Sequence, residues 1–491
     1  MSNYIIVNNK RNWQFNIPGV EVISARDYLL EDEFIRMRGA RIFNLCRSYR
    51  YQSIGYYVSL LASARGHKSF PNVSTIQEMK TPYVIRVLAE DLDRSIQKSL
   101  AHIQSDTFVL SIYFGKNISK RYDRLCLQIY NLFQAPLIRV FFSRKGIRWK
   151  IQNIQLISAN DIPEEHHQYV IEFATQYFSR AISRKKRRPA APYDMAILVN
   201  YDEATPPSNK KAIEKFIKAG EKNGFNVELI DKDDLHRIAE FDALFIRETT
   251  SVNHYTFRFA QRAAAEGLVV MDDPDSIIKC TNKVYLAELL SHYRIPAPKT
   301  VVISRDTLEL VLSSMELPLI LKQPDSSYSQ GVLKVETRGE YFVKVNALLE
   351  KSDLIIAQEF IKTEYDWRVG IIDGYPLYVC KYYMAEDHWQ IVNWAKNKKS
   401  NKHSGKGETL SVSDVPKKVI KTALKAAGYI GRGFYGVDLK MIGCKCYVIE
   451  VNDNPSIDFG VEDKVLKDEL YDTVMKIFYD KVKLLKENSS N

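Results

Sequence analysis

Short apolar runs alternate with helical patterns in the middle of the chain. One helical pattern covers 210–223 and stops at Gly224, between two of these runs. Strands that alternate with helices through short connections predict a parallel sheet with crossover helices. Functional side chains of such sheets gather at the carboxyl ends of the strands, where we expect Asn200 and Arg247. The apolar runs lie at 195–199, 226–230 and 243–247.

The following part of the chain has a different pattern, because its strands are short and follow one another closely. This spacing is typical of antiparallel hairpins and predicts an α+β structure. Helices are predicted at 281–293 and 416–427. The predicted strands lie at 300–303, 317–323, 333–336, 354–359, 368–372, 376–382, 436–442 and 446–452.

The first 185 residues or so form a separate α/β domain by the same criteria. Strands are predicted at 4–7 and 108–112, and helices at 41–65 and 122–133. Residues 47–57 alternate arginines with tyrosines and hydroxyl side chains. This alternation suits the binding of bases or phosphates by stacking and charge, and it equally suits a helix packed by tyrosine rings with extended arginines.

The clearest boundary lies at 184–192, where five successive cations are followed by two prolines within four residues. Mutual repulsion and the restricted proline backbone predict an exposed linker, with a nucleic-acid or targeting patch as the alternative.

Composition excludes several classes of protein and does not select a partner. The 491 residues are 45% hydrophobic and 26% charged, which is typical of soluble globular domains. No apolar run approaches the length of a membrane span, and six scattered cysteines favour reduced thiols in a cytoplasmic protein. The net charge of +11 is compatible with nucleic acid, acidic peptides or nucleotides.

Three oxygen-bearing side chains near the C-terminus indicate a metal site. Glu450 and Asn452 lie on one face of a strand, because strand side chains alternate. A turn centred on 443–445 would place Asp438 opposite Glu450, with apolar residues on the other face. Opposed carboxylates repel without a cation, and hard oxygen donors favour Mg²⁺. An exposed hairpin of alternating polarity is the alternative.

Two lysines are candidates for the phosphates that accompany such a metal. Lys322 ends an apolar strand and precedes the loop 323–331, which is rich in small hydroxyl residues. Lys283 opens a predicted helix. A lysine above such a loop can hold phosphates by charge and hydrogen bonds.

The order of these residues resembles that of the ATP-grasp superfamily, and most closely its RimK-like branch. The resemblance covers about 193–480. Residues 44–51 also resemble the N-terminal domain that accompanies some RimK-like proteins. The matching pieces are Asp272-Asp273-Pro274, Asn282-Lys283, Ile320-Leu321-Lys322, Gln358-Glu359-Phe360-Ile361, Asp366-Trp367-Arg368-Val369, Gly436-Val437-Asp438 and Glu450-Val451-Asn452-Asp453-Asn454-Pro455.

The resemblance implies an ADP-forming carboxylate–amine ligase whose parallel-sheet domain precedes two α+β subdomains that clasp ATP. Lys283 and Lys322 would contact ATP phosphates, and Arg368 would lie near the transferred phosphoryl group or the substrate carboxylate. Gln358, Glu359 and Ile361 would contact adenine. Asp438, Glu450 and Asn452 would hold Mg²⁺, with Mn²⁺ as the alternative. The implied parts are 1–183 (RimK-like ATP-grasp N-terminal domain), 184–192 (linker), 193–275 (pre-ATP-grasp domain), 276–358 (central subdomain) and 359–486 (C-terminal subdomain).

The phosphate loop departs from the family pattern, and two other segments supply candidate substrate residues. The phosphate loop has Ser326, Ser327, Tyr328 and Ser329 before a single Gly331, and bulkier residues restrict the approach of backbone to phosphate. The basic segment 396–407, with Lys402, would face an acidic acceptor or form a solvated loop. Arg247 could clamp a substrate carboxylate, and His254 could accept a proton or be structural.

Three functions are compatible with these features. The first is ligation of an amino acid such as glutamate to the carboxyl group of a peptide or protein, in which an acidic acceptor suits the basic segment. The second is synthesis of a dipeptide or a similar small metabolite. The third is a non-catalytic nucleic-acid-binding protein, which the full set of candidate metal and phosphate residues disfavours. No membrane partner is expected, and oligomerisation is open.

Overall fold

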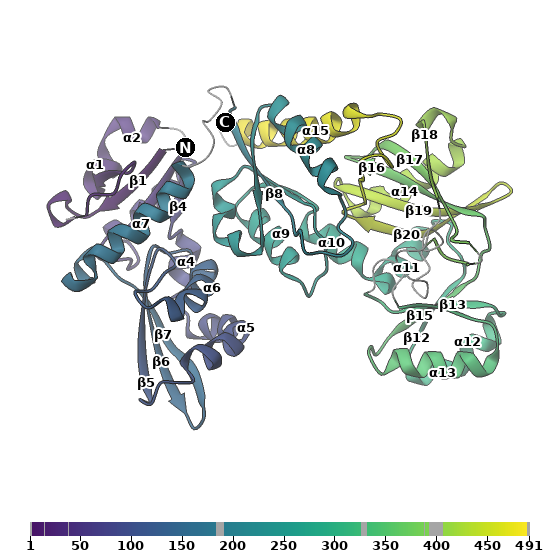
Figure 1. The fold of residues 1–491 in the computed structure, drawn as a ribbon, viewed down its shortest axis with the longest axis horizontal. Coiled ribbons are helices and arrows are strands. Elements are labelled where there is room, and N and C mark those ends of the chain that lie inside the picture. Colours follow the sequence, from purple (N-terminus) through teal and green to yellow (C-terminus); the bar gives the residue numbers. More distant parts are fainter. Residues whose placement is uncertain are drawn as a thin grey trace. The chain divides into compact units, whose positions relative to one another are not determined.

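The chain forms two compact units, Met1–Arg187 and Arg188–Asn491, each with its own hydrophobic clusters (Figure 1). The computed structural model describes residues 2–13, 15–37, 39–182, 191–325, 331–386, 388–391 and 406–488. The linker predicted at 184–192 lies outside the described residues, except for Ala191 and Pro192.

The first unit begins with a parallel sheet whose strand order is β2-β1-β3-β4. Two of its helices, α1 (Ala25–Leu30) and α3 (Ile54–Ala64), bury side chains in the same cluster as the strands. The short helices α2 (Asp32–Arg36) and α4 (Val73–Glu78) complete this part. Its strands are β1 (Ser2–Val7), β2 (Glu21–Ser24), β3 (Ala40–Asn44) and β4 (Lys68–Phe70).

The helix predicted at 41–65 is wrong over its first half. Residues 40–44 form strand β3, all five of them buried, and they pair in parallel with both β1 and β4. A central strand satisfies its backbone through neighbours that are distant in sequence, and local propensity does not reveal them. Helix α3 begins only at Ile54, after Ser53 has accepted a hydrogen bond from the Tyr56 amide at 3.4 Å.

The rest of the first unit is an antiparallel meander in the order β5-β6-β7, with helices packed on it. Side chains of α5, α6 and the three strands share one hydrophobic cluster. The elements are β5 (Thr107–Tyr113), β6 (Leu137–Lys145), β7 (Arg148–Leu156), α5 (Pro82–Leu100), α6 (Asp123–Phe133) and α7 (His167–Ile182).

The second unit opens with the parallel sheet that the apolar runs predicted, in the order β11-β10-β8-β9. Its strands are β8 (Tyr193–Leu198), β9 (Phe225–Ile230), β10 (Ala243–Ile246) and β11 (Val269–Met271). Side chains of β8 alternate between two clusters. Met195 and Ile197 pack with α8 (Lys210–Lys222) and α15 (Asp468–Asn488), whereas Ala196 and Leu198 pack with α9 (Tyr255–Ala265). Both faces are therefore covered, as an all-apolar parallel strand requires.

Two antiparallel sheets follow, as the closely spaced strands predicted. The first has the order β12-β15-β13-β14 and packs on α12 (Leu308–Ser314) and α13 (Arg338–Leu349). The second has the order β18-β17-β16-β19-β20 and packs on α14 (Lys417–Ile430) and α11 (Lys283–His292). The strands are β12 (Thr300–Ile303), β13 (Leu319–Lys322), β14 (Val332–Val335), β15 (Ile355–Glu359), β16 (Tyr365–Ile372), β17 (Tyr375–Tyr383), β18 (Gly407–Leu410), β19 (Phe434–Ile442) and β20 (Lys445–Asp453).

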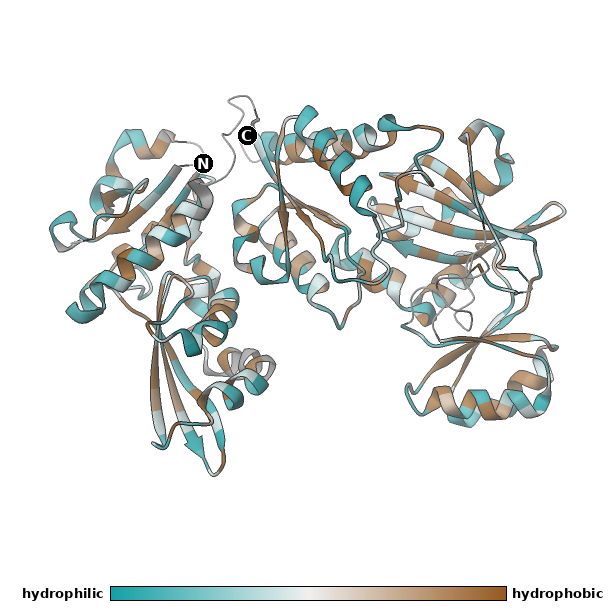
Figure 2. Ribbon diagram, in the orientation of Figure 1, coloured by the Kyte–Doolittle hydropathy of each residue, from teal (hydrophilic) through white to brown (hydrophobic). Residues whose placement is uncertain are grey.

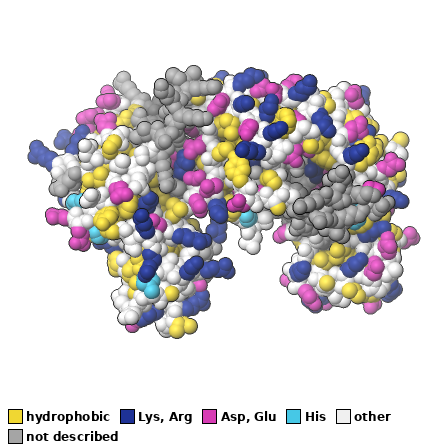
Figure 3. Space-filling model, viewed as in Figure 1, with side chains coloured by type: hydrophobic (Ala, Val, Ile, Leu, Met, Phe, Trp, Pro, Cys, Tyr) yellow, Lys and Arg dark blue, Asp and Glu magenta, His cyan; other side chains and the backbone are white. Residues whose placement is uncertain are grey.

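The distribution of polarity agrees with this layering. Figure 2 shows hydrophobic strands in the parallel sheet of the second unit and helices with hydrophilic residues along part of their length. Basic and acidic side chains are interspersed over the second unit on the face seen in Figure 3. Among the described helices, none has an apolar stretch long enough to span a bilayer.

Candidate active site

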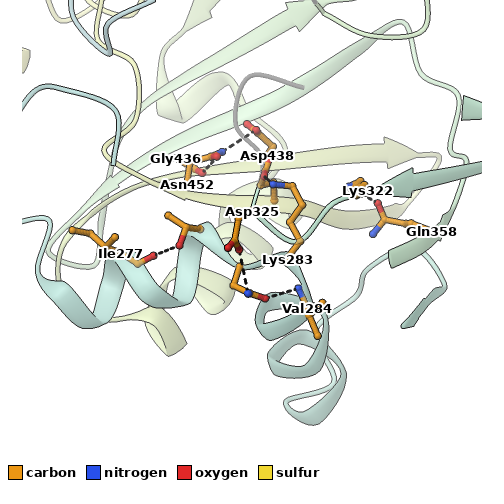
Figure 4. Close-up of polar contacts among 12 residues, drawn as sticks. Ile277, Lys283, Val284, Lys322, Asp325, Gln358, Gly436, Asp438 and Asn452 are labelled. Atoms are coloured by element: carbon orange, nitrogen blue, oxygen red, sulfur yellow. Dashed lines mark hydrogen bonds and ion pairs between the residues drawn. The ribbon is translucent and has the colours of Figure 1, made fainter. Parts of the chain in front are cut away.

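One cavity of about 310 Å³ collects most of the predicted site residues. Its walls come from the two antiparallel sheets, from the start of α11 and from the segments that follow β10 and β20. Every residue predicted to contact ATP or a metal lines it, and so does Arg368. Residues separated by up to 169 positions in the sequence, from Lys283 to Asn452, therefore face one space (Figure 4).

The β19–β20 hairpin places Asp438 directly opposite Glu450, as predicted, although its turn is shorter than predicted. Ile442 pairs with Lys445, so the turn consists of Gly443 and Cys444. A β-bulge after Asp438 restores the expected register. Ile449, predicted to face away with the other apolar residues, lies at this bulge and lines the cavity.

Arg368 neutralises Asp438 from the neighbouring strand. The two residues are paired across β16 and β19, and Arg368 Nε and Nη2 each donate to an Asp438 oxygen at 2.7 Å. Burial alone would lower the pKa of Arg368, but Asp438 raises it well above its ordinary value. Two parallel bonds from one guanidinium fix the carboxylate in orientation as well as charge.

Lys283 neutralises Glu450 in the same way from helix α11. Its Nζ lies 3.0 Å from Glu450 Oε1, and the lysine is 7% exposed. Burial would raise the pKa of Glu450, but Lys283, Lys322 and Arg368 lower it below its ordinary value. Glu450 is therefore an anion at neutral pH despite its position inside the protein.

The start of α11 explains why Lys283 is held in place. Asn282 caps the helix by accepting from the Val284 amide at 3.0 Å (Figure 4) and from the Tyr285 amide at the same distance. Its amide nitrogen donates to Asp325 Oδ1 at 3.2 Å, and the Lys283 amide donates to Pro324 O at 3.0 Å. The helix start is thus joined to the beginning of the loop after β13.

Lys322 is the third cation and has a neutral partner. Its Nζ donates to Gln358 Oε1 at 2.8 Å, and Gln358 in turn donates to Thr300 Oγ1 at 3.0 Å. Burial lowers the pKa of Lys322 to about 8, with Lys283 also lowering it and Glu450 opposing the shift. A buried ammonium bound to an amide is suited to an anion that would raise its pKa again.

The segment 358–361 forms the other end of the cavity. Ile361 is buried, while Glu359 is exposed and accepts from the Lys299 amide through Oε2 at 3.3 Å. Phe360 also lines the cavity and contacts Trp389 edge to face, with ring centroids 6.0 Å apart. This end offers apolar and aromatic surface, which suits a planar ring.

The donor set near Asp438 fits a hard divalent cation. Asp438 and Glu450 supply carboxylates on one face, and Asn452 Nδ2 lies 3.1 Å from Asp438 Oδ2. The described residues contain no cluster of three or more Asp, Glu, His or Cys suited to a metal. Two carboxylates and an amide match Mg²⁺, which completes its shell with phosphate oxygens and water.

Two of the predicted substrate residues, Arg247 and His254, are not among the described residues that line the cavity. Arg247 is 1% exposed and donates to Asn454 Oδ1 at 2.7 Å and to Ser208 Oγ at 2.8 Å, so it ties β10 to the segment after β20. His254 caps α9, with Nδ1 3.0 Å from Thr256 Oγ1. Their roles toward substrate stay predictions. Lys402 and Ser326–Ser329 lie outside the described residues.

Sequence reasoning missed a third ion pair in the cavity, between Lys440 and Asp366. Asp366 also accepts from Thr363 Oγ1 at 3.2 Å, and burial raises its pKa. Strand alternation was the available signal. Residues 366/368, 438/440 and 450/452 are three polar pairs spaced by two on neighbouring strands, which indicates one polar face.

Other missed residues line the side nearer the parallel sheet. Thr249, Thr250 and Ser251 follow β10, and Thr250 Oγ1 donates to Asp453 Oδ2 at 2.5 Å. Burial raises the pKa of Asp453. These residues follow Arg247 and Glu248 at a strand carboxyl end, where the sequence pattern predicted functional side chains but indicated only Asn200 and Arg247.

The comparisons with known proteins agree with this architecture. Residues 25–173 match the model of the RimK-like ATPgrasp N-terminal domain, and residues 280–468 match that of the RimK-like ATP-grasp domain. A protein of Aliivibrio fischeri (strain MJ11) named "Probable alpha-L-glutamate ligase" is 28% identical over 273 residues, covering 52% of this chain and 87% of that one. A relative of the same name from Cellvibrio japonicus (strain Ueda107) is 27% identical over 239 residues, covering 47% and 74%.

A solved structure of D-alanine–D-alanine ligase from Bacillus anthracis complexed with ATP is 16% identical. It covers 60% of this chain and 99% of its own, with a TM-score of 0.47.

The matched domains and the cavity define an enzyme, an ATP-grasp ligase of the carboxylate–amine class that uses ATP and a divalent cation. The chain belongs to the RimK-like ATP-grasp family and carries the N-terminal domain that goes with it. The predicted fold class is thereby confirmed.

Proposed function

We propose that the protein joins the amine of an amino acid, glutamate first among them, to a carboxyl group of a peptide or protein while ATP is converted to ADP and phosphate. The observation that carries this proposal is the cavity, which is lined both by four cationic side chains and by a set of hard oxygen donors. Relatives named probable glutamate ligases support glutamate as the first amino acid to test.

In this proposal Lys283 and Lys322 bind the phosphates, and segment 358–361 binds adenine. Asp438, Glu450 and Asn452 hold Mg²⁺, for which Mn²⁺ is the alternative. The bound cation supplies charge neutralisation for the phosphoryl group. Ion pairs hold Arg368 beside Asp438 and Lys283 beside Glu450, and the same arginine and lysine would be available to phosphate when a cation binds beside these carboxylates.

The chemistry then needs positioning and charge more than a protein nucleophile. A substrate carboxylate oxygen attacks the γ-phosphorus and ADP leaves, which produces an acyl phosphate. The amine nitrogen attacks the acyl carbon, loses a proton, and phosphate leaves with the bonding electrons. Arg368 is placed to neutralise charge on the equatorial oxygens. Thr249–Ser251, at the opposite side of the cavity, are suited to the substrate side.

We also propose the division of the second unit into 193–275, 276–358 and 359–486. Its three separate sheets support this division, because each sheet takes its strands from one of these stretches. The one exception is that β15 extends a single residue past 358, to Glu359. Helix α15 packs with the first sheet although it ends the chain, and Lys215 Nζ lies 2.6 Å from Asp468 Oδ1.

The test is to incubate the pure protein with ATP, Mg²⁺, pooled amino acids and acidic peptides, and to measure ADP, AMP and phosphate. ADP and phosphate that depend on glutamate, with a peptide product heavier by one glutamyl residue in mass spectrometry, are the expected results. A dipeptide product would instead assign the enzyme to small metabolites. AMP and pyrophosphate would exclude the acyl-phosphate route, and absence of turnover together with nucleic-acid binding would favour a binding protein.

A further inference from the structure

The first unit has a crevice of its own at the carboxyl ends of β1 and β3. In the order β2-β1-β3-β4, the chain passes from β1 to β2 on one side and then to β3 on the other. The strand order therefore reverses between β1 and β3, and ligands of open parallel sheets bind outside the carboxyl ends at such a point. A small hollow lies there, lined by residues 7–9, Leu45, Arg47 and 158–160.

The loop that follows β3 is built around buried Asn44. The Asn44 side chain accepts from the Cys46 amide at 3.2 Å and donates to Gly55 O at 2.7 Å and Ser59 Oγ at 2.8 Å. Tyr49 OH donates to Asn44 O at 2.6 Å. These bonds tie the strand end to the start of α3 and hold the loop between them in one conformation.

Close packing adds to this constraint. A Cβ on Gly55 would lie 2.4 Å from Ser48 O and 2.8 Å from the Cys46 Cβ, so only glycine allows α3 to approach the loop. Ser53 Oγ donates to Ser48 O at 2.8 Å, and the Arg50 amide lies 3.4 Å from Ser48 Oγ. The alternating arginine and tyrosine segment 47–57 is therefore a constrained loop over 47–53 and helix from Ile54 onward.

This constrained loop presents uncompensated positive charge. Arg47 and Arg50 are exposed, and neither has a carboxylate partner within the described part of the chain. The Arg47 amide donates to Asn8 Oδ1 at 2.7 Å, which joins the β1 and β3 loops across the crevice. With its amide oxygen turned inward, Asn160 accepts from Arg47 Nε at 3.2 Å. The neutral Asn160 amide thus contacts the guanidinium without neutralising it, while Asn8 binds only the Arg47 backbone.

We propose that this crevice is a second ligand site, which binds the phosphate group of a small phosphorylated molecule independently of the ligase cavity. Arg47 lines the hollow and Arg50 follows three residues later in the same loop, so two guanidinium groups are available to match the double charge and the oxygen acceptors of a phosphate monoester. Arg11, which follows β1, adds a third exposed cation on the same edge. The ring of Tyr51 is 68% exposed beside Arg50 and offers an apolar surface to the rest of the ligand.

The experiment uses the full chain with its ligase cavity saturated by Mg²⁺ and a non-hydrolysable ATP analogue. Inorganic phosphate is then titrated in a calorimeter into the wild type, R47Q/R50Q and the control R121Q/R124Q, whose arginines are exposed on the same unit. We expect the wild type and the control to bind phosphate alike and R47Q/R50Q to bind at least about tenfold more weakly. R47K keeps the positive charge and loses the planar guanidinium, so its affinity for phosphate should lie between those of the wild type and R47Q/R50Q.

Equal phosphate binding by R47Q/R50Q and the control would overturn the proposal, as would a wild type that shows no saturable binding. Succinate, a dicarboxylate, and a short single-stranded oligonucleotide are titrated in parallel. Binding of the oligonucleotide without binding of phosphate would assign the loop to nucleic acid and would also overturn the proposal. Far-ultraviolet circular dichroism of each variant confirms that the unit remains folded. The result does not depend on ligase turnover.

Discussion

Asp438 has more partners inside the cavity than the metal-binding role proposed for it requires. It accepts two bonds from Arg368 and one from Asn452, and it faces Glu450 across the hairpin. We expect Asp438→Asn to reduce the rate of ADP formation by at least about 10²-fold, because the amide weakens both cation binding and the pairing of Arg368. Steady-state kinetics as a function of Mg²⁺ concentration measure this effect.

The control for this variant is Asp353→Asn, at an exposed position outside the cavity, which should leave the rate unchanged. Higher Mg²⁺ should restore part of the lost rate of Asp438→Asn if the carboxylate binds the metal. A rate equal to that of the wild type at low Mg²⁺ would contradict the assignment of Asp438.

Lys322 should make nucleotide binding depend on pH in a particular window. Burial lowers its pKa to about 8, and a bound triphosphate favours the charged form. We therefore expect the dissociation constant of a Mg²⁺-bound ATP analogue to rise between pH 8 and 9, by at most about tenfold. Isothermal titration calorimetry in buffers of different ionisation enthalpy would also detect the proton taken up on binding.

Lys322→Met should bind the ATP analogue more weakly, and its dissociation constant should no longer rise between pH 8 and 9. If the rise persisted in this variant, the pH dependence would belong to another group. Protein stability changes in the opposite direction. Because the pKa of Lys322 is lower in the folded state, burial of its charge costs stability below pH 8, and the cost disappears as the pH rises toward the unfolded pKa. Weaker binding at pH 9 is therefore not a consequence of unfolding through Lys322.

Among the helices, α11 connects stability to nucleotide binding through its cap. Asn282 caps α11, and Lys283 is the first residue of that helix. We expect Asn282→Ala to lower the free energy of unfolding by about 1 kcal/mol and also to weaken binding of the ATP analogue, because Lys283 and the segment at Asp325 both lose a constraint. Chemical denaturation and calorimetry measure the two effects.

Asn209→Ala is the matched control, since Asn209 caps α8 by accepting from the Ala212 amide at 3.0 Å outside the cavity. It should cost a similar amount of stability with unchanged nucleotide affinity. If both variants weaken binding equally, the effect belongs to global stability and not to the position of Lys283.

The strands show how far register can be predicted from the sequence. The opposition of Asp438 and Glu450 was predicted from a turn one residue longer than the real one, and a bulge compensates for the difference. That Glu450 and Asn452 share a face was predicted independently of the turn, from the alternation of strand side chains. The place of Ile449 depended on the bulge, which no local pattern indicates.

For the whole chain, the two units should respond differently to ligand. Six hydrophobic clusters of the described residues each draw their members from one unit, and all described residues that line the candidate nucleotide cavity belong to the second. We expect two calorimetric transitions, of which a Mg²⁺-bound ATP analogue at 100 times its dissociation constant stabilises one by about 2.7 kcal/mol. A single transition that shifts as a whole would show that the units unfold together.

Order along the chain and strand alternation were enough to predict the parallel sheet of the second unit and its antiparallel sheets, and they selected candidate metal and phosphate residues that line one cavity. These signals are local, because a buried strand or an opposed carboxylate pair imposes its residue types wherever it lies. Only the tertiary structure decided that residues 40–44 form a strand, that Asp366 and Lys440 belong to the cavity and that Arg247 is tied to the segment after β20. Each of these depends on partners that approach from distant parts of the chain, and pairing of that kind leaves no periodicity in the sequence.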